Sequence, residues 1–591
     1  MIKTLSDFYY HQLEKNPKED AFTQKENGEW VSLSIQSFID KSNQLSTGLL
    51  NLGIKRGDKI AVISNNRTEW HLLDLAVQQL GIVNVPLYPN ITEDDYKYIL
   101  NDSGAKMVFI SDEAILAKIL NIKKYTPLLE HIYTFNIIEG QKHYSYLLNN
   151  EAKLDVIKQL NSVLEETDVA TLIYTSGTTG NPKGVMLTHE NLVSNVLEAE
   201  ERLPLADEQR GLSFLPLCHV FERMLDYLYI YKSVSVYYAE SMDSIGEDLK
   251  DVKPHIFATV PRLLEKVYDK IVAKGNDLSG VKKLLFFWAL RLGLKYDPIE
   301  SIGILYTYKL KIANKIIFNK WREALGGNVM VVGVGGAALQ PRLARVFTAA
   351  KIPVLEGYGL TETSPIIAVN SCLPEGMMIG TVGLPLNNLE VKIASDGEIL
   401  VKGPSVMKGY YNQPELTKEV INEDGYFHTG DIGELVDGKY LKITDRKKEI
   451  FKTSGGKYIA PQVMENKFKE SRFIEQVMVI GEGEKMPAAF VQPNFLFLKE
   501  WCHRKGVVYV SDAEIVKVER VKARFQKEVN LLNESFSSFE QIKCFELINH
   551  VWTIDSGELT PTLKLKRKNI LQKNQENYQK IYGKEAMSIS L

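Results

Sequence analysis

Cysteine is scarce in this chain, and its scarcity excludes several classes of protein. The 591 residues contain four cysteines, Cys218, Cys372, Cys502 and Cys544, and none of them forms a Cys-x-x-Cys pair. This excludes a disulfide scaffold and a cysteine zinc site, and it indicates a reducing compartment. No stretch approaches the roughly 20 apolar residues of a membrane-spanning helix, and the N-terminus lacks the apolar core of a signal peptide. The formal net charge of −3 offers no general attraction for nucleic acid. We therefore expect a cytoplasmic protein with no integral membrane segment and no nucleic-acid partner.

What the chain does contain is enough apolar sequence for a large α/β protein. Hydrophobic residues make up 45% of it, and its length exceeds the roughly 100–200 residues of one domain. Short β-branched runs alternate with helical patterns, which is typical of parallel sheets covered by helices. The predicted strands are 59–64, 81–88, 105–111, 170–175, 234–240, 255–260, 328–336, 477–483 and 488–493, and the predicted helices include 69–80 and 512–532. Turn residues become dense between Ser395 and Gly456, so we place a domain boundary near Asp445 to Lys448, which gives domains 1–445 and 446–591.

The stretch TSGTTGNPKG, residues 175–184, has a composition suited to holding an anion. Gly177 and Gly180 can adopt positive φ, so backbone N–H groups can converge with the hydroxyls and Lys183 on one point. A polyphosphate is the natural ligand for such a loop. The kinase-type P-loop, GxxxxGK[ST], is not matched, because Pro182 precedes the lysine and the following GVML is typical of a returning strand. A surface loop of solvated small residues is the alternative for this stretch taken alone.

Four further motifs follow this loop along the chain. The five segments are YTSGTTGNPKGVMLTHENL (174–192), EGYGLTETSP (356–365), HTGDIGEL (428–435), TDRKKEIFKTSGGKYIAP (444–461) and LTPTLKLKRKNI (559–570). Together they resemble the adenylate-forming superfamily, which contains acyl-CoA synthetases, nonribosomal peptide adenylation domains and luciferases. With RTEWHLLDLAVQQLGIVNVPLYPN (67–90), the resemblance covers nearly the whole chain.

The resemblance implies both a fold and a reaction. The fold is α/β: a large N-terminal domain of helix-covered, mainly parallel sheets with a small barrel-like subdomain, and a small mobile α+β C-terminal domain. In the first half-reaction, a carboxylate joins the α-phosphate of ATP and pyrophosphate leaves. In the second, the thiol of coenzyme A attacks the acyl-adenylate. Two anions meet in the first step, so the site needs ATP, Mg²⁺ and groups that neutralise charge.

The motifs also imply roles for single residues. Thr361 would contact the α-phosphate, Glu362 would hold Mg²⁺ with Thr178 beside it, and Asp431 would accept both ribose hydroxyls. Tyr358 would stack on adenine, against backbone at residues 335–337. The whole set implied for nucleotide and CoA binding is Thr175, Ser176, Gly177, Thr178, Thr179, Gly180, Lys183, Gly335, Gly336, Ala337, Tyr358, Gly359, Asp431, Arg446, Lys448, Gly455 and Gly456. Turn, core and helix-capping roles are the ordinary alternatives for such residues, and their shared context favours the site.

The family supplies one catalytic lysine from its small domain. TPTLKLKR (560–567) lacks the SxGK form of many relatives, so we assign the role to Lys564 and keep Lys566 as the alternative. Such a basic string is otherwise typical of a solvated face. The implied hinge of the rotating domain is Lys448, two residues after the motif arginine. Rotation would bring SGG (454–456) to the site as a passage for the pantetheine arm of CoA.

Two segments indicate the acid. PLCHVFER (216–223) and ATVPRLLEKVYDKI (258–271) resemble the long-chain fatty acyl-CoA synthetases, in which PLxHxFER and VPRxxEK elements recur. His219 would line or gate the fatty acid channel, and a structural histidine is the alternative. No general base is required, because a fatty acid is ionised at neutral pH. The predicted activity is AMP-forming long-chain fatty acid–CoA ligase. The alternatives are a ligase that loads acyl carrier protein or takes shorter or aryl acids, a luciferase-like oxygenase, and a catalytically silent fatty-acid-binding scaffold.

One basic and apolar region bears on a membrane partner. VKKLLFFWALRLGLKY (281–296) and YTYKLKIANKIIFNKWREAL (306–325) interleave lysine and arginine with large apolar residues. This pattern permits a peripheral membrane contact. We favour a helical insertion that packs on the protein with its lysines in water, because the periodicity is not cleanly two-faced.

Overall fold

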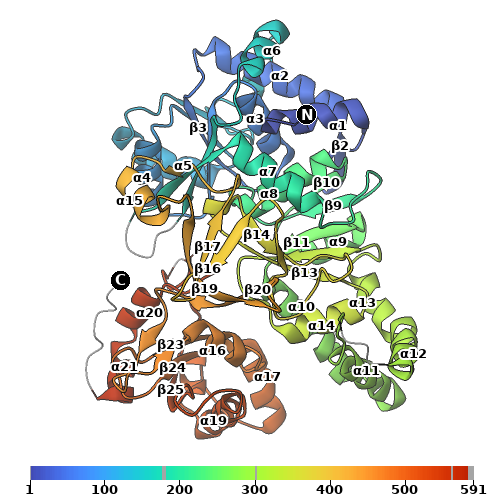
Figure 1. Ribbon diagram of the computed structural model, residues 1–591, viewed down its shortest axis with the longest axis vertical. Helices are drawn as coiled ribbons and strands as arrows, with labels where there is room; N and C mark the ends of the chain where they lie inside the picture. Colours follow the sequence, from blue (N-terminus) through green and yellow to red (C-terminus); the bar gives the residue numbers. More distant parts are fainter. Residues whose placement is uncertain (1, 176–180, 300–302, 555, 561–562, 584–591) are drawn as a thin grey trace. The chain divides into compact units, whose positions relative to one another are not determined.

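The computed structural model describes residues 2–175, 181–299, 303–554, 556–560 and 563–583 (Figure 1). Contacts within the chain divide it into two compact units. The first unit comprises Met1–Lys392, Leu400–Thr429 and Leu435–Leu441. The second comprises Ile393–Ile399, Gly430–Glu434 and Lys442–Leu591.

A nine-stranded sheet lies in the first unit. Its strands are β1 (Phe22–Glu26), β2 (Glu29–Leu33), β9 (Arg210–Ser213), β10 (Ser235–Tyr238), β11 (Ile256–Thr259), β12 (Val331–Val334), β13 (Val354–Gly359), β14 (Ile366–Val369) and β15 (Leu384–Pro385). Their order is β15-β14-β13-β12-β11-β9-β10-β1-β2. The pairs from β13 through β11, β9 and β10 to β1 are parallel, and the strands at the two edges are antiparallel. The carboxyl ends of the central strands therefore meet at one edge, where α/β proteins place their ligands.

A seven-stranded sheet completes the first unit. It consists of β3 (Lys59–Ile63), β4 (Val83–Leu87), β5 (Met107–Ile110), β6 (His131–Thr134), β7 (Val169–Thr175), β8 (Lys183–Thr188) and β18 (Gly409–Tyr410), in the order β18-β8-β7-β4-β3-β5-β6. Along β3, Ile60 and Val62 enter one hydrophobic core and Ala61 and Ile63 enter another. The sheet is thus buried on both faces, which explains why its strands are continuous apolar runs in the sequence.

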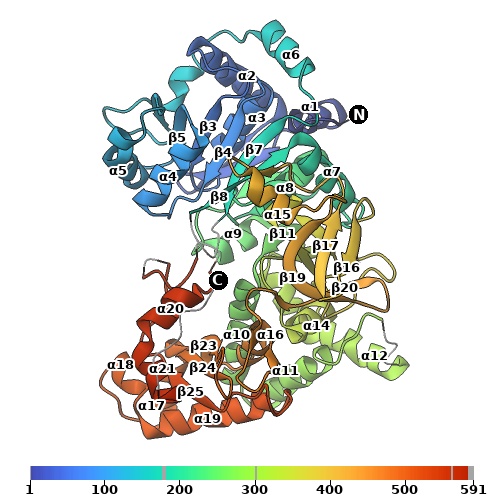
Figure 2. The ribbon, with the colours of Figure 1, turned by 60° about the vertical axis from the view of Figure 1, so that its left-hand side comes forward.

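Helices cover both sheets, as the alternating pattern predicts. Those of the first unit are α1 (Leu5–Lys15), α2 (Ile35–Asn51), α3 (Thr68–Gln78), α4 (Glu93–Ser103), α5 (Glu113–Ile122), α6 (Leu154–Ser162), α7 (His189–Glu200), α8 (Val220–Tyr231), α9 (Ile245–Val252), α10 (Pro261–Asp277), α11 (Gly280–Gly293), α12 (Ile304–Ala313), α13 (Asn319–Ala324), α14 (Pro341–Ala349) and α15 (Pro414–Val420). Short 3₁₀ helices are η1 (Lys123–Tyr125), η2 (Tyr144–Leu147) and η4 (Thr361–Thr363). The element η3 (Asn314–Phe318) is a short π-helix, called the π-turn below. Figure 2 shows α4 and α5 beside β3, β4 and β5.

Helix α8 is held by a buried network of charged and polar side chains. Arg223 donates to Asp74 over 2.6 Å and to Thr171 over 2.9 Å, and Tyr227 donates to the second Asp74 oxygen over 2.5 Å. Arg223 and Asp74 are both fully buried. Separating the partners of such a pair would leave uncompensated buried charges, which is strongly destabilising. The network therefore holds the start of α8 in place.

The small barrel-like part implied by the resemblance corresponds to a four-stranded sheet. Its strands are β16 (Glu390–Ile393), β17 (Glu398–Lys402), β19 (Phe427–Val436) and β20 (Tyr440–Arg446), in the order β16-β17-β19-β20.

The second unit has its own α+β core. It contains β21 (Phe451–Lys452), β22 (Tyr458–Ile459), β23 (Ile474–Ile480), β24 (Ala488–Pro493), β25 (Cys544–Leu547), α16 (Pro461–Phe468), α17 (Phe495–Lys505), α18 (Asp512–Ile515), α19 (Glu519–Asn533), α20 (Arg567–Lys573) and α21 (Gln575–Tyr582). Successive residues of β23 alternate between two hydrophobic cores, as the period of a strand requires: Val477 and Val479 enter one, Met478 and Ile480 the other.

Two sequence predictions in this unit were wrong in detail. The predicted helix 512–532 is two helices, because Val518 is extended and the burial of Ile515 and Val516 holds a turn between them. The predicted strand 477–483 begins earlier, at Ile474, and ends at Ile480. The following GEG forms a turn instead, in which Glu484 N–H donates to the Gly481 carbonyl over 3.1 Å.

Candidate functional site

The stretch predicted to bind an anion lies between two paired strands. β7 and β8 pair antiparallel, and Thr175 lies opposite Lys183. This confirms the two predicted flanking strands, whereas a kinase-type P-loop is followed by a helix. Ser176, Gly177, Thr178, Thr179 and Gly180 lie outside the described residues, so their predicted phosphate contacts stay predictions.

Tyr410 connects the two halves of the predicted phosphate site. Its strand, β18, pairs with β8 beside the hairpin, with Tyr410 opposite Val185. The Tyr410 hydroxyl donates to Glu362 Oε1 over 2.8 Å, and Lys183 Nζ lies 5.2 Å from the centre of its ring. Burial, together with the Glu362 carboxylate, raises the pKa of Tyr410 far above its usual value, so the hydroxyl keeps its proton and stays a donor. Sequence reasoning missed this residue, because nothing distinguishes it within MKGYYN.

Glu362 and Thr361 lie on a turn that is also held by the segment preceding β18. The backbone N–H of Met407 donates to the Glu362 carbonyl over 2.8 Å. Thr361 is buried and Glu362 is half-buried. A half-buried carboxylate with one oxygen already fixed is a hard-oxygen ligand that suits Mg²⁺, which binds through one or two carboxylates together with substrate phosphates. The donor chemistry of Glu362 therefore fits the predicted metal role.

Gly359 has a structural reason to be glycine. A Cβ atom there would lie 1.8 Å from the Pro365 carbonyl oxygen, so no side chain fits. The close approach lets β13 turn directly into the Thr361–Thr363 turn. The motif glycine thus places Tyr358 and Thr361 at the end of β13, whatever contact it makes with a nucleotide.

The parallel strands bring the other predicted residues of the first unit to one edge. His219 follows β9, Gly335 to Ala337 follow β12, and Tyr358 lies near the end of β13. A Cβ on Gly335 would lie 3.2 Å from the Phe221 ring. The PLCHVFER segment (216–223) and the segment GVGGAAL (333–339) are therefore in contact. Gly336 has φ of +82°, a value that favours glycine, and Gly336 and Ala337 are exposed. Their backbone is accessible, as a contact with adenine would require.

His219 has a structural role that the sequence left as the alternative. It precedes the first turn of α8, and its Nδ1 accepts a hydrogen bond from Phe221 N–H over 3.2 Å. Histidine here caps a helix that the Arg223 network fixes. A role for His219 in a fatty acid channel remains a prediction.

Glu356 gives the first unit a testable pH dependence. Its carboxyl is buried and accepts from Leu339 N–H over 2.9 Å, and burial raises its pKa to about 8. The folded pKa exceeds the unfolded value, so the stability that neutral Glu356 contributes is complete below about pH 4.5 and is lost as pH rises toward 8, by at most about 1.4 kcal/mol per pH unit. We expect Glu356→Gln to remove this loss. Melting temperatures would then fall less steeply between pH 6 and 8.5 in the variant than in the wild type, and parallel curves would contradict the assignment.

The ribose motif and the hinge motif meet in the second unit. Arg446 Nε lies 3.2 Å from Asp431 Oδ1, and Asp431 is buried. Lys447 bridges Asp396 and Glu398, at 2.7 and 2.8 Å. Glu398 also accepts from Gly430 N–H over 2.9 Å, beside the ribose aspartate. Sequence reasoning missed Glu398 and Lys447, whose partners lie far apart in the chain.

The predicted hinge borders a buried carboxyl. Asp445 accepts from Gln462 N–H over 3.1 Å, in the first turn of α16, and burial raises its pKa to about 7. Lys448 is exposed, as are Gly455 and Gly456. These positions are accessible, as a hinge and a thiol passage would need to be.

The described residues of the terminal lysine motif form a hairpin, and Arg567 anchors it to the second unit. Leu559 pairs with Leu565, and Lys566 N–H donates to the Glu558 carbonyl over 2.8 Å. Arg567 donates to Glu465 Oε1 over 2.6 Å and to the Val479 carbonyl over 2.8 Å. Lys564 and Lys566 are both exposed and flank Leu565, which packs on the core. Lys564 follows Leu563, whose φ of +60° is glycine-like, where the SxGK form has glycine.

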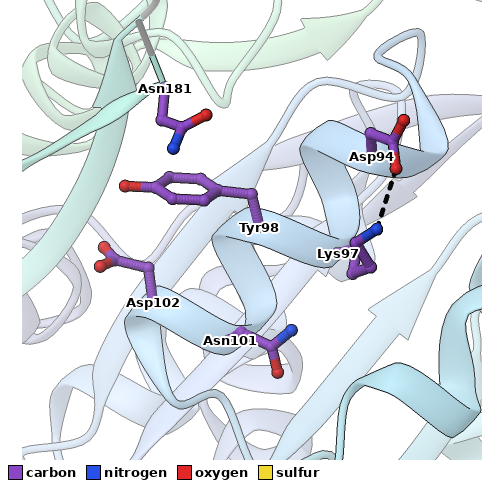
Figure 3. Close-up of a pocket in the computed structure, with 6 residues that line it drawn as sticks. All are labelled: Asp94, Lys97, Tyr98, Asn101, Asp102 and Asn181. Atoms are coloured by element: carbon purple, nitrogen blue, oxygen red, sulfur yellow. Dashed lines mark hydrogen bonds and ion pairs between the residues drawn. The ribbon is translucent and has the colours of Figure 1, made fainter.

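A pocket of about 560 Å³ is lined in part by the stretch predicted to bind phosphate (Figure 3). Residues of α4 line it together with Asn181, which points toward the Tyr98 ring, and Asp94 pairs with Lys97 at 3.0 Å. At the end of α4, Asp102 accepts from the Tyr174 hydroxyl over 2.6 Å. Helix α4 therefore holds the last residues of β7 through the Tyr174–Asp102 hydrogen bond.

Comparisons with known proteins bear on the family and the fold. The sequence profile described as AMP-binding enzyme matches residues 9–411. The chain is 32% identical over 567 residues to the Long-chain-fatty-acid–CoA ligase FadD15 of Mycobacterium bovis, covering 95% of this chain and 94% of that protein. It is 32% identical over 585 residues to the Long-chain-fatty-acid–CoA ligase 6 of Homo sapiens, covering 93% and 82%. The A domain of carboxylic acid reductase from Segniliparus rugosus, solved with AMP and a co-purified carboxylic acid, has a TM-score of 0.74 at 20% identity and covers 98% of this chain and 94% of that one. This last likeness shows the fold alone, and it confirms the predicted α/β architecture.

Proposed function

Because the chain belongs to the AMP-binding enzyme family, we propose that it joins a long-chain fatty acid to coenzyme A, using ATP and releasing AMP and pyrophosphate. The observation that carries this proposal is similarity along almost the whole chain to proteins named long-chain fatty acid–CoA ligases. The PLCHVFER and VPRLLEK segments, which the sequence analysis linked to long-chain acids, follow β9 and β11 at the same sheet edge.

In the proposed first half-reaction, an oxygen of the fatty acid carboxylate forms a bond to the α-phosphorus and the bond to pyrophosphate breaks. Lys183 and the phosphate loop hold the departing phosphates, and Thr361 and Lys564 contact the α-phosphate, where charge develops as the bond to pyrophosphate breaks. Glu362 would hold Mg²⁺, which would neutralise phosphate charge. Tyr410 keeps Glu362 in place through the 2.8 Å hydrogen bond.

In the proposed second half-reaction, the CoA sulfur bonds to the acyl carbon, the bond from that carbon to the AMP oxygen breaks, and the thiol proton is released to solvent. Residues from the predicted domain 446–591 rotate about Lys448 between the steps, and Gly455 and Gly456 line the approach of the thiol. Asp431 and Arg446 hold the ribose. The exposure of the hinge and glycine residues and the Asp431–Arg446 contact support these assignments.

Two alternatives have less support. A ligase for acyl carrier protein would share every residue of the first half-reaction, and only the acceptor would differ. A silent scaffold predicts damage to the reactive groups, yet Glu362, Asp431 and Lys564 are all present. The relatives named above are long-chain fatty acid–CoA ligases, which favours CoA as the acceptor.

We further propose a peripheral contact with a lipid surface, since the substrate is poorly soluble in water. Among the helices that the structure describes, none combines the length and apolarity that crossing a bilayer requires. The cytoplasmic location expected from cysteine usage stays a prediction.

A product assay tests the proposed function. The purified full chain is given ATP, Mg²⁺, CoA and an equimolar series of acids from acetate to stearate, and thioesters and AMP are counted by mass spectrometry. We expect long-chain acyl-CoA with an equal amount of AMP. AMP-linked product without a CoA thioester would redirect the second step to a carrier protein, and no ATP consumption with any acid would contradict the enzyme assignment.

A further inference from the structure

Helix α12 is apolar on two opposite faces, and one of them is exposed. Ile304, Leu305, Tyr308 and Ile312 have spacings of one helical face, with exposed fractions of 91%, 68%, 63% and 38%. Ile316, in the following π-turn, is 39% exposed. We call these five residues the outer face of α12. Both ribbon views draw this helix at the margin of the first unit (Figures 1 and 2).

The opposite face explains why the outer face cannot simply turn inward. Leu310 and Ile317 pack against the main hydrophobic core, and Tyr306 donates to the Leu292 carbonyl of α11 over 2.9 Å. Asn314 donates to the Ala349 carbonyl over 2.8 Å, and Arg322 to the Ala350 carbonyl over 2.7 Å. The inner face is therefore packed on the protein and the lysines are exposed, as we expected for a helical insertion, while the outer apolar face remains uncovered by the described residues.

The charged side chains on α12 and in the residues that follow it to Arg322 have one sign. Lys309, Lys311 and Lys315 are exposed on or beside it, and the sequence from Gly303 to Arg322 contains no aspartate or glutamate. An apolar helical face rimmed by lysine is typical of a helix that lies in the plane of a bilayer surface. The lysines are complementary to anionic lipid headgroups, which attract each nearby basic residue. A protein partner would have to supply both an apolar groove and an acidic rim.

We propose that the outer face of α12 docks on an anionic lipid bilayer, with its apolar side chains entering the headgroup region and its lysines contacting lipid phosphates. Docking would give the synthetase access to an acid that partitions into lipid, so its purpose rests on the proposed function. The contact itself requires neither ATP nor catalysis, and the two claims can therefore fail separately.

Vesicle flotation of the full chain tests the docking. The wild type is mixed, without ATP, with vesicles of phosphatidylcholine alone or of phosphatidylcholine with phosphatidylglycerol. We expect binding to the anionic vesicles that weakens when salt rises from about 0.1 M to about 1 M, where the screening length falls from about 10 Å to about 3 Å. Leu305→Ser with Tyr308→Ser, and separately Lys309→Gln with Lys311→Gln and Lys315→Gln, should each weaken that binding about tenfold or more.

Helix α6 of the same unit provides the matched control. Leu154 and Val156 are also exposed apolar residues, at 46% and 43%, and Leu154→Ser with Val156→Ser should bind vesicles as the wild type does. Melting temperature checks that each variant is folded. The proposal is overturned if the wild type does not bind anionic vesicles or if the α12 variants bind them as strongly as the wild type. It is also overturned if light scattering shows a wild-type dimer and monomeric α12 variants, which would make a second copy of the chain the occupant of this face.

Discussion

Replacement of Lys564 by alanine is expected to slow formation of the acyl-adenylate about 100-fold or more, the usual cost of removing one group that stabilises developing charge. The ammonium group would face the α-phosphate during the first step and would be withdrawn by the domain rotation before the second. Fatty-acid-dependent exchange of pyrophosphate into ATP measures that step directly. Conversion of a supplied acyl-adenylate to acyl-CoA, which does not use this lysine, should stay within a few-fold of the wild type.

Lys566→Ala is the matched control for this experiment. Both lysines are exposed and flank Leu565 in the same hairpin, so a general effect of charge or of hairpin stability would appear in both variants. A large loss in Lys566→Ala with a small one in Lys564→Ala would shift the assignment by two residues. Equal losses in both half-reactions would indicate damage to the hairpin rather than loss of a catalytic group.

Glu362→Gln is expected to reduce the first half-reaction by about 100-fold or more, because the amide keeps the shape of the side chain but loses the charge that holds Mg²⁺. Tyr410→Phe should have a smaller effect of about 10–100-fold, the usual loss when a partner that orients a metal ligand is removed. In Tyr410→Phe the Mg²⁺ concentration that gives half-maximal exchange should rise, since Glu362 loses the 2.8 Å hydrogen bond.

Tyr411→Phe is the control for the tyrosine variant. Tyr411 is the next residue, and its ring lies 5.5 Å from Lys59 rather than beside Glu362. It should behave as the wild type in the Mg²⁺ titration. If Tyr410→Phe melts at the wild-type temperature and its Mg²⁺ dependence is unchanged, Tyr410 does not position the metal ligand. Binding of Mn²⁺ and ATP, followed by electron paramagnetic resonance, gives the same test without turnover.

Sequence patterns predicted the strands well where apolar residues form a short uninterrupted run. The runs at β3, β5 and β7 are continuous because both sheet faces are buried, and each became a strand within two residues of its predicted bounds. The hairpin at Thr175 and Lys183 followed from the returning GVML. The predicted helix 512–532 was wrong because helical periodicity cannot show that Ile515 and Val516 turn into the core together.

The residues that sequence reasoning missed act through contacts distant in the chain. Tyr410 reaches Glu362, 48 residues earlier, only because β18 adds to the edge of a sheet built from much earlier strands. Arg567 reaches Glu465 across 102 residues. Neither contact leaves a local pattern, whereas the motif residues could be assigned because each belongs to a string whose order is specific.

Transfer of oxygen tests the central claim most directly. The fatty acid is labelled with ¹⁸O in its carboxylate and converted by the full chain with ATP and CoA, and the AMP is examined by mass spectrometry. If the acid attacks the α-phosphate and CoA later displaces AMP, one labelled oxygen from each acid converted must appear in AMP. Thioester formation with unlabelled AMP, or with ADP and labelled phosphate, would contradict an acyl-adenylate and with it the proposed roles of Lys564 and Glu362.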